Sequence, residues 1–423
     1  MKQIITLLLP FMLVFNLLGC GEVPKEDRGF DSTRSFTRYA PIVFAAETAD
    51  TIYFMASTGE QYLKYLDKAT GVSGFLCGKS ECRHMNETCN AYVGYYVWDI
   101  IVYNERLFWT YYSQEGNYFL YSMALDGTDR RIEAELPQQF IALGSRGRGY
   151  VLHDKWLYFR DVSVKIVDGQ QITYNYIAAF PLDSNEEPFV ILQEENPYDF
   201  DNLLSIQFYR GYLYILTNTV SYYSEKDETI LYDCKLRRWS VETGELETLY
   251  TENDSPLQWS IDLWVTDNSI YFNRDNVLNG VDNRIYRYDL DTGVCEYLFD
   301  NGLYGWIDMG LIADNLITGY QMTNNNNGIY DFYVVLKDFE GNVLVDDTYT
   351  LDIRDGYTNY GLNGLSYNVD FLGRDEGYAY YSFYGNEPSD KGQTSYVSII
   401  SVALDGSGAR VMCTQTESVA YGG

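Results

Sequence analysis

The residue types best suited to chemistry are gathered in one short stretch, residues 77–89. It contains Cys77, Cys82, His84 and Cys89 in the spacing C-x4-C-x-H-x4-C. Thiolates and an imidazole together suit a tetrahedral Zn²⁺ site. In an exported protein, two of the three cysteines would instead form a disulfide. The spacing leaves a structural zinc and a disulfide both open, and either would order this connection.

The remaining cysteines and the second histidine favour structural roles. Cys234, Cys295 and Cys413 stand singly in expected strands and are predicted to be small buried hydrophobic residues. His153 precedes a turn, at a position that other repeat units fill with Tyr or Thr. A Ser-His-Asp catalytic set is therefore not supported, and no catalytic residue is assigned.

The elements that must position the cysteines repeat along the chain. One recurring piece is a short turn that leads into an apolar and aromatic strand, as in residues 104–109. A spacing of 46 to 62 residues separates its seven anchors, which is the scale of propeller blades. The anchors are Ile52, Leu107, Leu157, Leu213, Ile270, Leu316 and Tyr378.

A second recurring piece is a tight turn such as Leu125-Asp126-Gly127. Asp followed by Gly favours a hairpin, because Gly adopts positive φ without steric cost. Seven versions of this turn alternate with the seven strand pieces, so each unit is expected to hold four short antiparallel strands.

These units predict an all-β fold, a β-propeller over residues 38–423. Seven four-stranded blades are expected, with six or eight as the alternatives. Such sheets bury both faces only against neighbouring sheets, as in a ring. The 42 Tyr and 35 Gly residues agree with strands and turns. The units stay in phase with the chain, so no strand exchange between the terminal blades is expected.

The N-terminus is expected to be processed. Residues 1–19 have the pattern of a signal peptide and are too short and interrupted for a membrane-spanning helix. The ending Leu17-Leu18-Gly19-Cys20 resembles the lipobox of bacterial lipoproteins, and an ordinary signal peptide is the alternative. The resemblance implies a lipid on Cys20 and an extracytoplasmic, membrane-anchored protein. The polar residues 20–37 would then be a flexible tether.

The charge excludes one class of partner. The formal net charge of −30 and the pI of about 4.3 would repel nucleic acids and anionic lipid headgroups. We therefore expect no nucleic-acid binding, and membrane contact only through the lipid on Cys20.

One strand motif carries a family resemblance. Leu107-Phe108-Trp109-Thr110 resembles the repeat signature of low-density-lipoprotein-receptor-type propellers. Together with the lipobox and the Leu-Asp-Gly turns, it makes the chain similar to bacterial propeller lipoproteins of unknown function. Propellers of the receptor type have six blades, whereas seven units are present here. The resemblance implies binding or scaffolding at a surface and supplies no catalytic residues.

Aromatic and acidic residues mark a candidate binding face. Each lies where the innermost strand of a unit begins. All such positions should lie on one face of the ring, around the mouth of the channel. The cysteine-rich connection should open onto the same face. Trp stacks on sugars and cations, and Asp accepts hydrogen bonds. The alternative is that the Trp rings fill space between blades. The residues are Trp98, Asp99, Trp259, Asp262, Trp306 and Asp308.

The sequence therefore predicts a lipid-anchored extracytoplasmic propeller that binds a surface protein or a glycan without catalysis. A carbohydrate-active hydrolase or lyase with carboxylates at the channel mouth is one alternative. A rigid scaffold of the cell envelope is the other.

Overall fold

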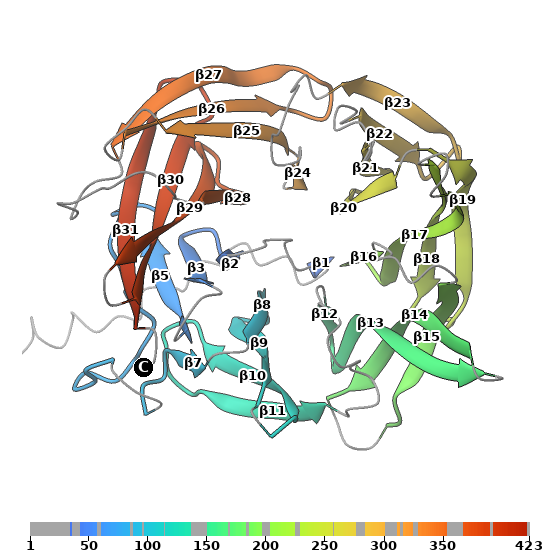
Figure 1. Cartoon of the computed structure of the whole chain (residues 1–423), viewed down its shortest axis with the longest axis horizontal. Coiled ribbons are helices and arrows are strands. Elements are labelled where there is room, and N and C mark those ends of the chain that lie inside the picture. Colours follow the sequence, from blue (N-terminus) through green and yellow to red (C-terminus); the bar gives the residue numbers. More distant parts are fainter. Residues whose placement is uncertain are drawn as a thin grey trace, which may run out of the picture.

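The computed structural model of the protein is a ring of β-sheets (Figure 1). The described residues form no helix, so no helix among them could cross a membrane. Seven sheets of four antiparallel strands surround a central channel, which confirms the predicted all-β, seven-bladed propeller. The structure describes residues 34–35, 43–56, 61–84, 88–94, 97–113, 115–136, 150–167, 170–182, 186–196, 204–224, 229–256, 258–275, 284–300, 311–313, 316–324, 329–352, 367–389 and 392–420.

The blades follow one another along the chain, and the first-named strand of each lies nearest the channel (Figure 1). Blade 1 consists of β2 (Val43–Glu47), β3 (Thr51–Ala56), β5 (Lys64–Asp67) and β6 (Ser73–Phe75). Blade 2 consists of β8 (Val97–Tyr103), β9 (Arg106–Tyr112), β10 (Tyr118–Ala124) and β11 (Arg131–Leu136). Blade 3 consists of β12 (Tyr150–His153), β13 (Trp156–Val167), β14 (Gln170–Pro181) and β15 (Phe189–Asn196). Blade 4 consists of β16 (Leu204–Tyr209), β17 (Tyr212–Ser224), β18 (Thr229–Ser240) and β19 (Leu246–Ser255). Blade 5 consists of β20 (Gln258–Val265), β21 (Ser269–Asp275), β22 (Arg284–Asp289) and β23 (Cys295–Asp300). Blade 6 consists of β24 (Leu311–Ala313), β25 (Leu316–Asn324), β26 (Ile329–Lys337) and β27 (Val343–Asp352). Blade 7 consists of β28 (Tyr367–Arg374), β29 (Tyr378–Ser389), β30 (Gly392–Ala403) and β31 (Ala409–Ala420).

Three short strands lie outside this pattern. β4 (Gln61–Tyr62) pairs with β7 (Tyr92–Gly94) in a small sheet beside the cysteine-rich connection. β1 (Arg34–Ser35) adds a fifth strand to the channel edge of blade 4 by pairing with β16. β1 belongs to the predicted tether of residues 20–37, whereas the predicted signal peptide and Cys20 lie outside the described residues.

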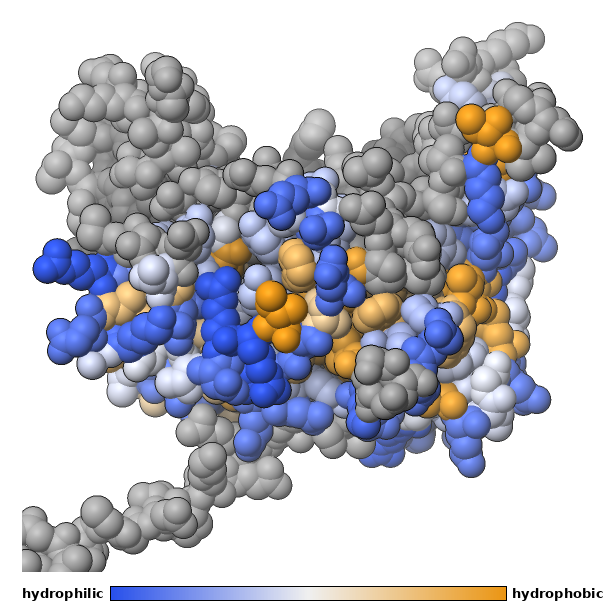
Figure 2. All heavy atoms as spheres, turned by 90° about the horizontal axis from the view of Figure 1, so that it is seen from below, coloured by the Kyte–Doolittle hydropathy of each residue, from blue (hydrophilic) through white to orange (hydrophobic). Residues whose placement is uncertain are grey.

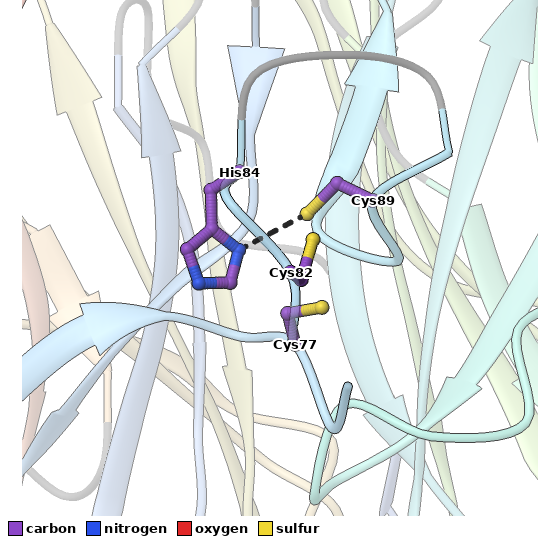
Figure 3. Close-up of side chains that lie close together, drawn as sticks. All are labelled: Cys77, Cys82, His84 and Cys89. Atoms are coloured by element: carbon purple, nitrogen blue, oxygen red, sulfur yellow. Dashed lines mark hydrogen bonds between the residues drawn. The ribbon is translucent and has the colours of Figure 1, made fainter. Parts of the chain in front are cut away.

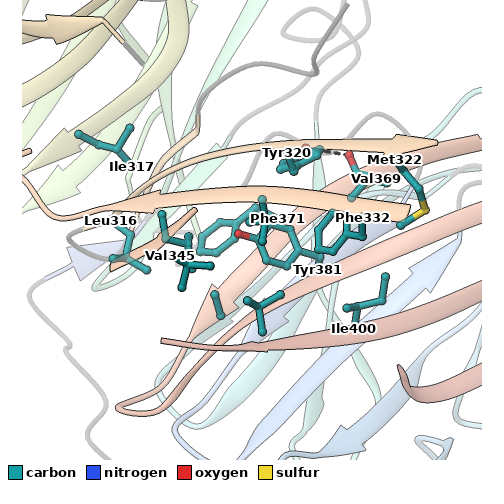
Figure 4. Close-up of a cluster of buried hydrophobic side chains, with 14 of the residues drawn as sticks. Leu316, Ile317, Tyr320, Met322, Phe332, Val345, Val369, Phe371, Tyr381 and Ile400 are labelled. Carbon is teal, nitrogen blue, oxygen red and sulfur yellow. Dashed lines mark hydrogen bonds between the residues drawn. The ribbon is translucent and has the colours of Figure 1, made fainter. Parts of the chain in front are cut away.

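Hydrophobic clusters join neighbouring blades. Trp109, from the motif that carries the family resemblance, is fully buried between blades 1 and 2 with Met55 and Met123. Figure 4 shows the cluster to which blades 6 and 7 contribute, where the Tyr320 hydroxyl donates to the Val369 carbonyl at 2.7 Å. Because both faces of a blade are buried in this way, its strands alternate only partly between apolar and polar residues.

The ring is closed by side-chain packing. Blades 1 and 7 each consist of strands from their own segment of the chain, as predicted. Between them, Lys68 donates to Glu47 at 2.7 Å and lies 5.1 Å from the centre of the Tyr380 ring. Gly373 makes this approach possible, because a Cβ there would lie 1.6 Å from the Glu47 carboxylate.

The ring has two different faces. We call the end of the blades that carries the turns between first and second strands the turn face, and the opposite end the hairpin face. On the hairpin face, the second and third strands of four blades continue beyond the innermost strand. In blade 3, for example, β12 pairs only with residues 156–159, whereas β13 and β14 stay paired to Val167 and Gln170. The other extended hairpins are β17–β18, β25–β26 and β29–β30.

Candidate metal centre and binding face

The three cysteines and the histidine of the predicted cluster come together in space. Cys77, Cys82, His84 and Cys89 lie in the connection between β6 and β7, and their ligand atoms are all within 4.8 Å of one another. Figure 3 shows the side chains converging from three sides. The three thiols are free. A tetrahedral zinc site with Zn–S bonds of about 2.3 Å needs ligand atoms about 3.5 to 4 Å apart, so a small contraction would complete it.

Local backbone features hold the four side chains in place. A tight turn brings the Cys82 amide to the Lys79 carbonyl at 3.1 Å. His84 adopts a φ of 53°, which is uncommon for a residue other than glycine. Its ring stacks on Phe75 at 5.0 Å, and its Nδ1 lies 3.3 Å from the Cys89 sulfur. The histidine is therefore oriented by packing before any metal binds.

The thiols have different affinities for protons. Burial, together with the neighbouring Cys82 thiol, raises the pKa of Cys89 to about 12. Burial acts in the same direction on Cys77, but hydrogen bonds from the Lys79 and Asn90 amides outweigh it and hold the Cys77 pKa below its usual value. A metal ion would replace these protons, because thiolates are the ligands.

The cluster is docked on the Asp126-Gly127 turn between β10 and β11 of blade 2. The Gly127 carbonyl accepts hydrogen bonds from the Gly78 amide at 3.0 Å and from the Asn90 side chain at 2.8 Å. Gly127 has a φ of 80°, and a Cβ there would lie 2.7 Å from the backbone nitrogen of Cys77. The sequence predicted only a hairpin at this turn. The support that the turn gives to the cysteine cluster was not predicted.

Two cations flank the cluster. Arg130 donates to the Tyr92 carbonyl and lies 5.1 Å from the centre of the Tyr121 ring. The Lys79 ammonium group donates to the Thr88 carbonyl at 2.5 Å. Three thiolates with one Zn²⁺ carry a net charge of −1, which these cations would balance. Neither cation was identified from the sequence. Lys79 lies between Cys77 and Cys82, where its position could have suggested a role, whereas nothing in the sequence around Arg130 refers to the cysteines.

The cluster and the predicted binding residues lie at different ends of blade 2. Gly127 follows Ala124, which pairs with Arg106 at the turn face, whereas Trp98 pairs with Thr110 near the hairpin face. The expectation that the cysteines open onto the face of the Trp residues was therefore wrong. The reason is that the connection docks on the Gly127 turn of blade 2 before it reaches β8, since the Gly78 amide donates to the Gly127 carbonyl at 3.0 Å.

Four of the six predicted binding residues can be placed by their strands. Trp98 and Asp99 lie in β8, and Trp259 and Asp262 lie in β20, two strands on different sides of the channel (Figure 1). The register of β8 shifts between Trp98 and Ile100, and that of β20 between Trp259 and Leu263. Asp99 and Asp262 thus each lie at a break in the regular pairing of their strand. Trp306 and Asp308 lie outside the described residues.

His153 is a packing residue in the structure. Its ring stacks on Phe208 with 3.7 Å between the ring centres. Burial lowers its pKa, which favours the neutral imidazole. His153 therefore packs against blade 4 through Phe208 of β16.

Comparisons with known proteins found likenesses to solved structures at low sequence identity and no match to a family or a curated sequence. A puromycin-hydrolyzing peptidase of Mycobacterium tuberculosis aligns with 88% of the chain at 14% identity and a TM-score of 0.49, and the chain spans 53% of that protein. The β-propeller domain of the Trilobed protease from Pyrococcus furiosus aligns with 88% at 10% identity and a TM-score of 0.45, and 98% of it is covered. An ulvan lyase of a polysaccharide lyase family aligns with 91% at 11% identity and a TM-score of 0.46, and 96% of it is covered.

Proposed function

We propose that the protein is a lipid-anchored, extracytoplasmic propeller that binds a surface protein or a glycan on its hairpin face without catalysis. The observation that carries this proposal is that four extended hairpins project on one face of a rigid ring. Loops and hairpins held by a rigid scaffold are common binding elements. In the edge-on view of Figure 2, side chains at the upper right stand above the body of the ring.

The proposed contact residues are the aromatic and acidic residues at the starts of the innermost strands. Trp98 with Asp99 lies near the start of β8, Trp259 lies near the start of β20, and Asp99 and Asp262 lie at register shifts of these strands. An indole stacks on a sugar ring or a cation, and a carboxylate next to it accepts hydrogen bonds. Trp306 and Asp308 are proposed to complete the set on the basis of their repeat position.

Binding measurements with the full chain test this proposal. Purified protein is applied to a glycan array and to solubilised envelope proteins, beside Trp98→Ala, Trp259→Ala and the turn-face control Trp156→Ala. Each hairpin-face variant is expected to bind about tenfold more weakly, the loss of one stacked aromatic contact, with an unchanged melting temperature. Unfolding of both variants would instead show that the indoles pack between blades. Turnover of any bound glycan would contradict the absence of catalysis.

We also propose that the cysteine cluster holds a structural Zn²⁺. Four suitable ligands lie within 4.8 Å of one another beside two cations, and the thiols are free. The bound ion would cross-link a connection of few apolar residues and keep it seated on the Gly127 turn. Cys77, Cys82, Cys89 and His84 would be the ligands.

Metal analysis of the purified chain gives a direct test. About one zinc per chain is expected, as in structural Cys3His sites, and Cys82→Ser and Cys89→Ser should lose most of it. Cys295→Ser, a single cysteine in β23, should retain the metal. A zinc-free protein with two of the three cluster thiols oxidised would show that the stretch forms a disulfide instead.

A further inference from the structure

The N-terminal strand β1 shows how the chain enters the ring. β1 runs antiparallel to β16, with Arg34 opposite Tyr209 and Ser35 opposite Phe208. Tyr209 is the last residue of β16 before the Arg210-Gly211 turn on the turn face. β1 therefore runs from the turn face towards the hairpin face, with Arg34 at its turn-face end.

The first strand of blade 1 continues this path. β2 begins at Val43, which pairs with Ala56, and ends at Glu47 beside the turn face. Its start therefore lies towards the hairpin face. In Figure 1, β1 lies in the central opening between β16 and β12. β1 thus runs from the turn face towards the hairpin face beside blade 4, and β2 begins towards the hairpin face in blade 1.

Chain length decides which face an anchor at Cys20 can approach. Fourteen residue steps separate Cys20 from Arg34, which reach at most about 49 Å and average about 20 Å for a flexible chain. The tip of β17 lies thirteen residues above the turn face, or about 43 Å. A lipid beyond the hairpins would require an almost fully extended tether that also reverses the direction set by β1. A lipid below the turn face requires neither.

We propose that the anchored protein is oriented with its turn face towards the membrane and presents its hairpin face to the medium. This rests on the lipid anchor proposed above. Its partner is then a soluble or extracellular molecule, and not a component embedded in the same membrane. The cysteine cluster, docked at the turn-face end of blade 2, lies on the membrane side.

Energy transfer from single labelled positions to the membrane measures this orientation. The exposed residues Val72 and Val294 lie in turn-face turns of blades 1 and 5, and the exposed Ile166 lies near the tip of the β13–β14 hairpin. Each is replaced singly in the full chain by p-azidophenylalanine and coupled to a donor dye, with acceptor dye in the lipid. The lipidated protein is compared with the chain from residue 21 held on nickel-chelating lipid by an N-terminal hexahistidine tag.

Both turn-face labels should transfer strongly, and the Ile166 label about threefold less, because the hairpin adds about 40 Å. Equal transfer from all three positions, or stronger transfer from Ile166, would overturn the orientation. Transfer that differs between Val72 and Val294 would show that the ring stands on its edge and would also overturn it. If only the tagged chain binds vesicles and gives the expected order, the orientation holds and the lipid anchor is wrong.

Discussion

Gly127→Ala is expected to lower the free energy of unfolding by about 3 to 5 kcal/mol, the sum of a strained φ, a steric overlap and lost hydrogen bonds. The φ of 80° disfavours any residue with a Cβ. The new methyl group would also lie 2.7 to 2.8 Å from backbone atoms of residues 76–78, which cannot rotate away. The cysteine connection would have to shift, which weakens its hydrogen bonds from Gly78 and Asn90 to the Gly127 carbonyl.

Gly406→Ala is the matched control for this change. Gly406 occupies the same position in the Leu404-Asp405-Gly406 turn of blade 7, has a φ of 73°, and would have no atom within 4 Å of a Cβ. Gly406→Ala should therefore lower the free energy of unfolding only by the cost of the strained φ, about 1 to 2 kcal/mol. Chemical unfolding of both variants gives the difference, and zinc content should fall in Gly127→Ala alone. Equal losses in the two variants would show that the connection is not seated on the Gly127 turn.

Glu194→Gln is expected to cost about 3 kcal/mol, because it leaves two cations without their carboxylate between blades 3 and 4. Glu194 in β15 pairs with Arg237 in β18, and with Lys235 at 3.2 Å. The Arg237 side chain is only 6% exposed. It keeps one hydrogen bond, from Nη1 to the Thr217 hydroxyl at 3.0 Å, which limits the loss. Glu195→Gln, an exposed neighbour on the same strand, is the control and should change stability little.

The effect of Glu194→Gln should depend on pH. Burial acts against ionisation of Glu194, but Arg237 and Lys235 outweigh it and hold the Glu194 pKa below its usual value of 4.5. A lowered carboxyl pKa stabilises the fold above the unfolded-state pKa, and this stability is lost as the pH falls through the folded-state pKa. The difference in free energy of unfolding between wild type and Glu194→Gln should thus be largest at pH 7 and should shrink below about pH 4. A difference that stays constant across this range would mean that the charge is not its cause.

The repeat units were predictable because their signals are local. The strand 106–112 and the turn at Asp126-Gly127 are encoded by neighbouring residues, and their recurrence predicts the blades. Each sheet has two apolar faces, which only a closed arrangement buries, so the ring followed from the strand pattern. The four members of the cysteine cluster were predictable for the same reason, since they lie within thirteen residues of one another.

The surroundings of the cluster were not predictable in this way. Gly127 and Arg130 come from blade 2, and no pattern near the cysteines refers to them. The end of blade 2 at which the cluster lies depends on the hydrogen bond between Gly78 and Gly127, two residues far apart in the sequence. The direction of β1 along β16 depends on a pairing between residues 34–35 and 208–209.

The sequence by itself determined the all-β class, the seven units and the possible metal ligands. These follow from residue types and periods within short windows of the chain. The tertiary structure alone decided that the cysteines converge, that they rest on the Asp126-Gly127 turn, and that Trp98 lies at the opposite end of that blade. Contacts between segments far apart in the chain depend on strand length and register, which short-range patterns do not specify.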